Sequence, residues 1–173
     1  ITKTLSRRIS NIQYLFSQTQ GAYLKNRRIS DNINLINYIM EHTDRNEIPA
    51  YLVSLDATKA FDSVDHEFMW KVLGRFGFGD GFISICKMLY KDITAEVMLN
   101  GNRLSKFIIE KGVKQGDALS CVLFILCIEI LINQININND IKGIKISENE
   151  EVKVVSFADD VSPIVSDTQS LIE

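Results

Sequence analysis

Cysteine is scarce in this chain of 173 residues. The chain has three cysteines, Cys86, Cys121 and Cys127, and no two of them form a CxxC pair. An odd number at these spacings argues against a zinc site or a disulfide framework and is typical of small core residues in a reducing compartment. Charged residues, Lys3, Arg7 and Arg8, interrupt the N-terminal segment. No signal peptide is therefore expected. We therefore expect an intracellular protein, nuclear or cytoplasmic, that is not secreted.

Long hydrophobic runs are also lacking. The most apolar stretch, residues 118–132, contains Ser120 and Glu129 and is shorter than the roughly 20 residues that a membrane span requires. We expect a buried helix there and no membrane contact. The hydrophobic content of 46% and charged content of 24% are ordinary for a globular protein. The length allows one domain with a substantial core.

An excess of positive charge is absent, since the formal net charge is −3. This sum argues weakly against a nucleic-acid partner. The charges are unevenly spread, however: residues 1–45 carry seven basic and three acidic side chains, whereas residues 144–173 carry two basic and seven acidic ones. Such a division suits a protein that holds phosphates with one part and a divalent metal with another. It also arises often by chance, so it is permissive evidence only.

Hydrophobic periodicity predicts helices and strands that interleave along the chain, without repeats, linkers or low-complexity segments. The helices are expected at about 1–16, 31–40, 65–76, 82–90 and 119–132, with a basic loop at 18–30. Strands are expected at 50–55, 141–146 and 152–157, and a hairpin at 94–110 around the strong turn signal Asn100-Gly101. Ser30 or Asp31 would cap the second helix and Asp65 the third. This order predicts an α+β domain around a mixed sheet.

Two adjacent aspartates, Asp159 and Asp160, lie between valine-rich segments that we interpret as strands, at the tight turn that joins them. Burying an unpaired ionised carboxylate costs several kcal/mol, so the pair either lies in water or faces a cation. An isolated Asp-Asp fits an ordinary solvated turn equally well. The case for a site depends on residues upstream.

A third carboxylate, Asp56, ends the segment 50–55, which we interpret as a buried strand. Carboxylates at the ends of neighbouring strands concentrate negative charge near one point. Such oxygen ligands suit Mg²⁺, with Mn²⁺ as an alternative, and leave positions open for water and substrate phosphates. Two such ions a few Å apart stabilise the attacking and leaving oxygens of an in-line phosphoryl displacement.

Four motifs, in order, resemble the reverse transcriptases of non-LTR (LINE-type) retrotransposons. Residues 56–66 (DATKAFDSVDH) resemble motif A of that family, residues 114–120 (KQGDALS) resemble motif B, and residues 157–160 (FADD) resemble motif C. The stretch from Gln20 to Asn32, with Tyr23, Arg27 and Asp31, is similar to the family's fingers motif. The resemblance covers essentially the whole chain.

The resemblance implies an RNA-directed DNA polymerase with a right-hand fingers–palm fold, in which helices flank a small, mostly antiparallel sheet. Residues 1–48 would be the fingers portion, a helix, a basic loop and a second helix, and residues 49–173 the palm. The thumb would be absent, as would an endonuclease domain. The implied partners are an RNA template, a DNA primer and a dNTP, while the oligomeric state stays open.

The resemblance also assigns roles to residues. Asp56 and Asp159 would bind the metal, with Asp160 as a weaker third carboxylate. Phe61 would be the steric gate that excludes a 2′-OH, although a core phenylalanine is the alternative. The other residues expected around the incoming nucleotide and template are Ala57, Gln115, Gly116 and Arg27. Arg28 and Lys25 are as basic as Arg27 and compete with it for a phosphate contact.

Two positions depart from the family's pattern. Ala118 and Cys121 stand where prolines are usual, but proline is favoured rather than required at the start of a helix, so function should survive. Two alternatives stay open: a catalytically inactive palm that acts as a nucleic-acid-binding or scaffold remnant, and a different polymerase branch, such as a group II intron or retron enzyme.

Overall fold

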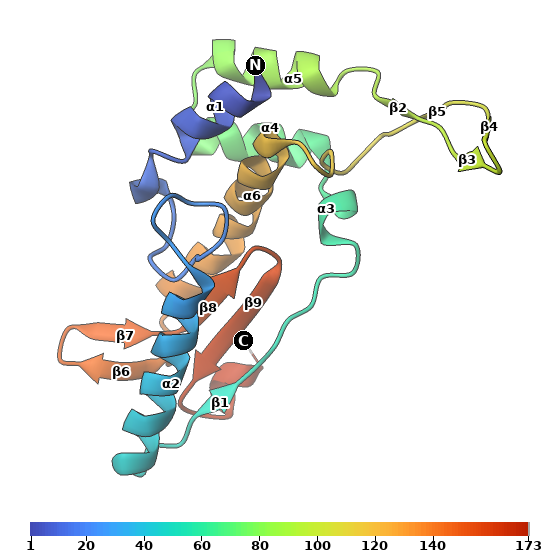
Figure 1. Cartoon of the computed structure of the whole chain (residues 1–173). Coiled ribbons are helices and arrows are strands. Elements are labelled where there is room, and N and C mark those ends of the chain that lie inside the picture. The colour runs from blue at the N-terminus through green and yellow to red at the C-terminus, as the bar shows by residue number, and fades with distance from the viewer. Residues whose placement is uncertain (173) are drawn as a thin grey trace. The chain divides into compact units, whose positions relative to one another are not determined.

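The computed structural model describes residues 1–172 and divides into two compact units (Figure 1). The first unit consists of Ile1–Thr58 and Gly116–Glu173, and the second of Lys59–Gln115. The helices and the small antiparallel sheets confirm the α+β class.

The first helix of the first unit is shorter than predicted. Helix α1 covers Thr2–Ile9, and a short 3-10 helix, η1, follows at Gln13–Leu15. The hydroxyl of Ser10 donates to the carbonyl oxygen of Arg7 at 3.2 Å. Such a local side-chain bond competes with further helical hydrogen bonds, which accounts for the early end. The next helix, α2, covers Ile29–Arg45, and the carboxylate of Asp31 accepts from the backbone N–H of Arg28 at 3.0 Å, at the third helical position.

The central sheet of the first unit has three antiparallel strands in the order β1-β9-β8. These are β1 (Tyr51–Leu52), β8 (Val154–Phe157) and β9 (Asp160–Val165). A separate hairpin pairs β6 (Ile144–Ser147) with β7 (Glu150–Val152). The prediction of a buried strand at 50–55 was wrong: β1 is a two-residue edge strand, and its side chains are exposed. An edge strand lacks a neighbour on one side, so an apolar composition alone does not bury it.

Both faces of β8 are covered, which explains why the adjacent residues Val154 and Val155 are both buried. Val154 packs in one core cluster with Ile132 and Ile135 of helix α6 (Ala118–Ile137). Val155 packs in another cluster with Ile39 of α2. The hairpin of β8 and β9 therefore lies between two helices, and its turn is held on a rigid scaffold (Figure 1).

Helix α6 confirms the predicted buried helix but is longer than expected, since it continues from residue 132 to Ile137. Its 20 residues make it long and apolar enough to cross a membrane by length and composition. It is nevertheless packed against α1 and β8 within the first unit, and 61% of its most apolar window is buried. The carboxylate of Asp117 caps its first turn by accepting from the N–H of Leu119 at 3.1 Å.

The second unit contains three helices and two pairs of very short strands. The helices are α3 (Ala60–Ser63), α4 (His66–Arg75) and α5 (Asp80–Tyr90). The strands are β2 (Thr94–Ala95) with β5 (Phe107–Ile108), and β3 (Met98–Leu99) with β4 (Asn102–Arg103). Asn100 and Gly101 join β3 to β4 with φ of +50° and +80°, as a type I′ turn requires, so the predicted hairpin is confirmed.

Candidate active site

The adjacent aspartates lie at the tip of the β8–β9 hairpin, as predicted. Phe157 pairs with Asp160, so Ala158 and Asp159 form a two-residue turn. Ala158 has a φ of +58°, which a residue with a Cβ adopts only at a cost of about 1 to 2 kcal/mol. Asp159 is half-buried and Asp160 is exposed. The aspartates therefore occupy a tight, conformationally restrained turn at the end of a buried strand.

Asp56 reaches the same end of the sheet. The pairing of β1 with β9 continues to Leu55, whose N–H donates to the carbonyl oxygen of Val161 at 2.9 Å. One further step in this antiparallel register sets Asp56 opposite Asp160. Asp56 is exposed. The Leu55–Val161 bridge thus carries the segment after β1 to the start of β9, so that Asp56 and the Asp159-Asp160 pair, about a hundred residues apart, lie toward the same end of the sheet.

The donor chemistry of this edge fits a hard divalent cation, because carboxylate oxygens on exposed or half-buried side chains are the ligands such ions take. Among residues 1–172, no three histidine, cysteine, aspartate or glutamate side chains are grouped closely enough to hold a metal as they stand. The carboxylate chemistry of Asp56, Asp159 and Asp160 fits a divalent cation, whereas their side chains are not gathered around a single point.

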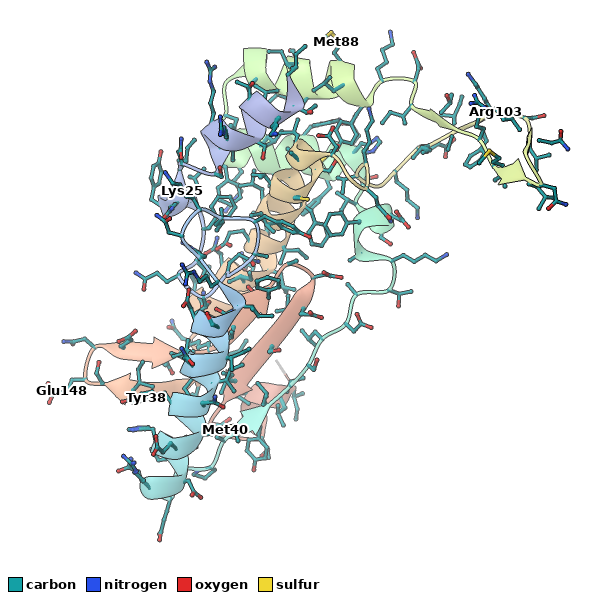
Figure 2. The ribbon with its side chains drawn as sticks, in the orientation of Figure 1. Lys25, Tyr38, Met40, Met88, Arg103 and Glu148 are labelled. Atoms are coloured by element: carbon teal, nitrogen blue, oxygen red, sulfur yellow. The ribbon has the colours of Figure 1, made fainter. Side chains whose placement is uncertain are left out.

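Arg27 has a different environment from the one the sequence suggested. Its guanidinium donates to the carbonyl oxygens of Ser17, of Gln20 at 2.7 Å and of Phe16 at 3.4 Å. Burial lowers its pKa, which the charge of Glu129 partly offsets. These bonds tie together the loop of residues 16–28. Lys25, by contrast, is exposed on this loop (Figure 2).

Tyr23 belongs to the same loop and adopts a φ of +57°. Its pKa is raised first by partial burial and then by the neighbouring Cys121 and Asp159. An exposed aromatic ring and the metal-ligand candidate Asp159 are therefore electrostatic neighbours within the first unit.

Ala57 and Gly116 also belong to the first unit. Both are exposed. Gly116 has a φ of +85°, and a Cβ built on it would meet no atom within 4 Å. The positive φ favours glycine, and the open space leaves the backbone there accessible to a ligand.

Phe61 and Gln115 are neighbours in the second unit. The carbonyl oxygen of Phe61 accepts from the N–H of Val113 at 2.8 Å, and the side-chain amide of Gln115 donates to Asp62 at 3.0 Å. The ring of Phe61 is half-buried. The second half of motif A and the start of motif B are thus hydrogen-bonded to each other.

Three buried polar residues of the first unit were not singled out from the sequence as parts of a site: Gln20, Asn32 and Glu129. Gln20 and Glu129 are 0% exposed. Glu129 interrupts an apolar helix, which is a visible signal, whereas Gln20 and Asn32 stand out only by their place in the fingers motif. Gln20 and Asn32 contact the strand that ends at the aspartates, and Glu129 anchors the loop that carries Gln20.

The chain is similar to known proteins in both sequence and fold. A family model described as reverse transcriptase (RNA-dependent DNA polymerase) matches residues 1–173. The chain is 29% identical over 142 residues to a retrovirus-related Pol polyprotein from type-2 retrotransposable element R2DM of Drosophila melanogaster, covering 82% of this chain and 13% of that protein. It is 28% identical over 173 residues to an uncharacterized 149 kDa protein of transposon TX1 from Xenopus laevis. This match covers 99% of this chain and 13% of that protein. The chain thus spans about an eighth of the length of these relatives.

Solved structures show the same fold at low identity. An apo telomerase from Candida tropicalis, truncated from its C-terminal domain, aligns with a TM-score of 0.65 and 13% identity, covering 99% of this chain and 35% of that one. Telomerase from Candida albicans, solved with a fragment of telomeric RNA, aligns with a TM-score of 0.68 and 11% identity. This alignment covers 98% of this chain and 29% of that one. The family model and the retrotransposon relatives confirm the resemblance to non-LTR retrotransposon enzymes: the chain belongs to the reverse transcriptase family.

Proposed function

We propose that this chain is the fingers–palm portion of an RNA-directed DNA polymerase that extends a DNA primer on an RNA template. The observation that carries the proposal is the bridge between Leu55 and Val161, which sets the residue before Asp56 beside the residue after the Asp159-Asp160 turn. In the reaction the primer 3′-OH attacks the α-phosphate of a dNTP and pyrophosphate leaves. Bound Mg²⁺ would supply charge stabilisation of the attacking and leaving oxygens.

The chain's own residues would mainly position these groups. Asp56 and Asp159 would hold the metal, with Asp160 in support, because they are the carboxylates at the strand ends. Phe61 is proposed as the steric gate against a 2′-OH. It is supported in that role by the hydrogen bonds that tie its segment to residues 113–115.

Ala57, Gln115 and Gly116 are proposed to border the incoming nucleotide and template. The open backbone at Gly116 supports a close approach there. For Arg27 a direct phosphate contact has less support, since backbone carbonyls already occupy its donors. The exposed Lys25 and Arg28 are the better candidates for that contact.

Primer extension on an RNA template with dNTPs and Mg²⁺ tests the proposal. The parent chain should extend the primer, and Asp159→Asn should slow extension about a hundredfold or more, because a metal ligand supplies several kcal/mol. Asp44→Asn, a change at an exposed aspartate on α2, is the matched control and should leave extension unchanged. Duplex binding without extension by the parent would instead support the inactive scaffold.

A further inference from the structure

The side chain of Gln20 replaces a missing backbone partner at the turn that carries the aspartates. Gln20 and Ser156 form a parallel bridge, in which Ser156 donates to Thr19 at 3.1 Å and Gly21 donates to Ser156 at 2.9 Å. In a continued parallel ladder the next N–H of the strand, that of Ala158, would donate to the carbonyl oxygen of residue 21. It donates instead to the side-chain Oε1 of Gln20, at 3.1 Å.

The same oxygen also fixes the loop from which it comes. Oε1 of Gln20 accepts a second bond, from the backbone N–H of Ala22 at 3.0 Å. Gln20 is 0% exposed, and Ala22 and Ala158 are also buried. Water therefore cannot substitute for either bond, and loss of the acceptor would leave two buried donors unsatisfied.

Close packing of the loop on β8 supports this attachment. The side-chain amide of Asn32 donates to the carbonyl oxygen of Ser156 at 2.8 Å. A Cβ built on Gly21 would lie 3.1 Å from both Asn32 and Phe157. The loop and the last residues of β8 thus approach as closely as two strands of one sheet.

We propose that Gln20 is a positioning residue of the polymerase site: it holds Ala158 in its positive-φ conformation and thereby sets the direction of Asp159. The proposal rests on the proposed function for the metal, but the hydrogen bond itself can be tested without it. Ala158 immediately precedes Asp159, and its φ of +58° is unfavourable for alanine. A strained turn persists only where its surroundings hold it. Without Gln20, the turn should relax and carry Asp159 away from Asp56.

Amide hydrogen exchange at Ala158 and Mg²⁺ titration, both followed by NMR of the ¹⁵N-labelled chain, test the proposal. Gln20→Met keeps the size of the side chain but removes the acceptor. It should speed exchange at Ala158 roughly two- to tenfold relative to the core amides of α6 and weaken Mg²⁺ binding about tenfold. Gln20→Glu retains an acceptor oxygen and should keep the slow exchange and the Mg²⁺ affinity.

Thr43→Val is the matched control, because Thr43 is a buried polar residue of the same unit whose hydroxyl bonds only within α2. It should leave both Ala158 exchange and Mg²⁺ affinity unchanged. If Gln20→Met does not fold, Gln20→Asn serves in its place, since the shorter side chain cannot reach both N–H groups and should give the same changes.

Three results would overturn the proposal. Unchanged Ala158 exchange in Gln20→Met would show that the turn does not depend on Gln20. Faster exchange with unchanged Mg²⁺ affinity, where Asp159→Asn abolishes Mg²⁺ binding, would show that Gln20 supports the fold but not the site. Absence of Mg²⁺ binding by the parent chain would overturn the metal-dependent function and with it the role of Gln20 toward Asp159. In that case the exchange data would separately decide whether Gln20 holds the turn.

Discussion

The backbone N–H of Ser17 donates to Oε1 of Glu129 at 2.6 Å, linking the loop of residues 16–28 to the middle of helix α6. Glu129 is 0% exposed, and its second carboxylate oxygen has no partner among the described residues. Burial raises the pKa of Glu129 to about 7, although the bond from Ser17 and the charge of Arg27 act in the opposite direction. The carboxyl thus holds its proton in the folded chain far above the pH at which an exposed glutamate loses it.

We expect this carboxyl to make the chain less stable as pH rises. Between about pH 4.5 and 7 the folded state binds a proton that the unfolded state has released, so the free energy of unfolding falls through this window. By linkage the loss amounts to about 3 kcal/mol at most. Urea denaturation at pH 5 and pH 8 measures it. Glu129→Gln should flatten the dependence, and an equal slope in both proteins would contradict the assignment.

Arg27→Lys should destabilise the chain by about 2 kcal/mol, because an ammonium cannot reproduce the fork of bonds to several carbonyl oxygens. Arg28→Lys, at the neighbouring exposed position, should be nearly neutral. Thermal or urea unfolding of both variants makes the comparison. If Arg27→Lys unfolds like the parent but binds template more weakly, Arg27 contacts nucleic acid as the motif originally suggested.

Gly112→Ala should destabilise the second unit by about 3 kcal/mol. Gly112 has a φ of +90°, and a Cβ there would lie 2.8 Å from the Cα of Asp62, so both backbone strain and a clash with backbone arise. Gly77→Ala has the positive φ without the clash and should cost only about 1 kcal/mol. Gly74→Ala, within helix α4, should stabilise by about 0.5 to 1 kcal/mol. Urea midpoints of the three variants should follow this order.

Asp65→Ala should cost about 1 kcal/mol, since the carboxylate of Asp65 accepts from the N–H of Phe68 at 2.7 Å and caps helix α4. Asp65→Ser retains a hydrogen-bond acceptor and should lower the free energy of unfolding by only a few tenths of a kcal/mol. Denaturation curves of the two variants test the cap. Equal losses would mean that the charge of Asp65, not its hydrogen bond, stabilises the helix.

Where neighbours along the chain decide the structure, the sequence was sufficient. Asn100-Gly101 has the backbone freedom that a type I′ turn needs, and Asp65 caps the helix that begins one residue later. Valine-rich flanks placed Asp159 and Asp160 at a hairpin turn, and the four motifs identified the family. In each case the deciding contacts lie within a few residues, so composition and spacing carry the information.

Tertiary structure decided what depends on distant partners. The contact of Gln20 with Ala158 spans 138 positions, and that of Ser17 with Glu129 spans 112. Periodicity cannot indicate which buried donor meets which acceptor across such a separation. For the same reason the exposure of β1 and the burial of the Arg27 guanidinium were not apparent: whether an apolar strand is covered, or a basic side chain is free, depends on which segments pack beside it. The sequence by itself determined the turn at Asn100-Gly101, the cap at Asp65 and the hairpin turn at Asp159 and Asp160, and only the folded chain determined the long-range hydrogen bonds that hold the Asp159-Asp160 turn in place.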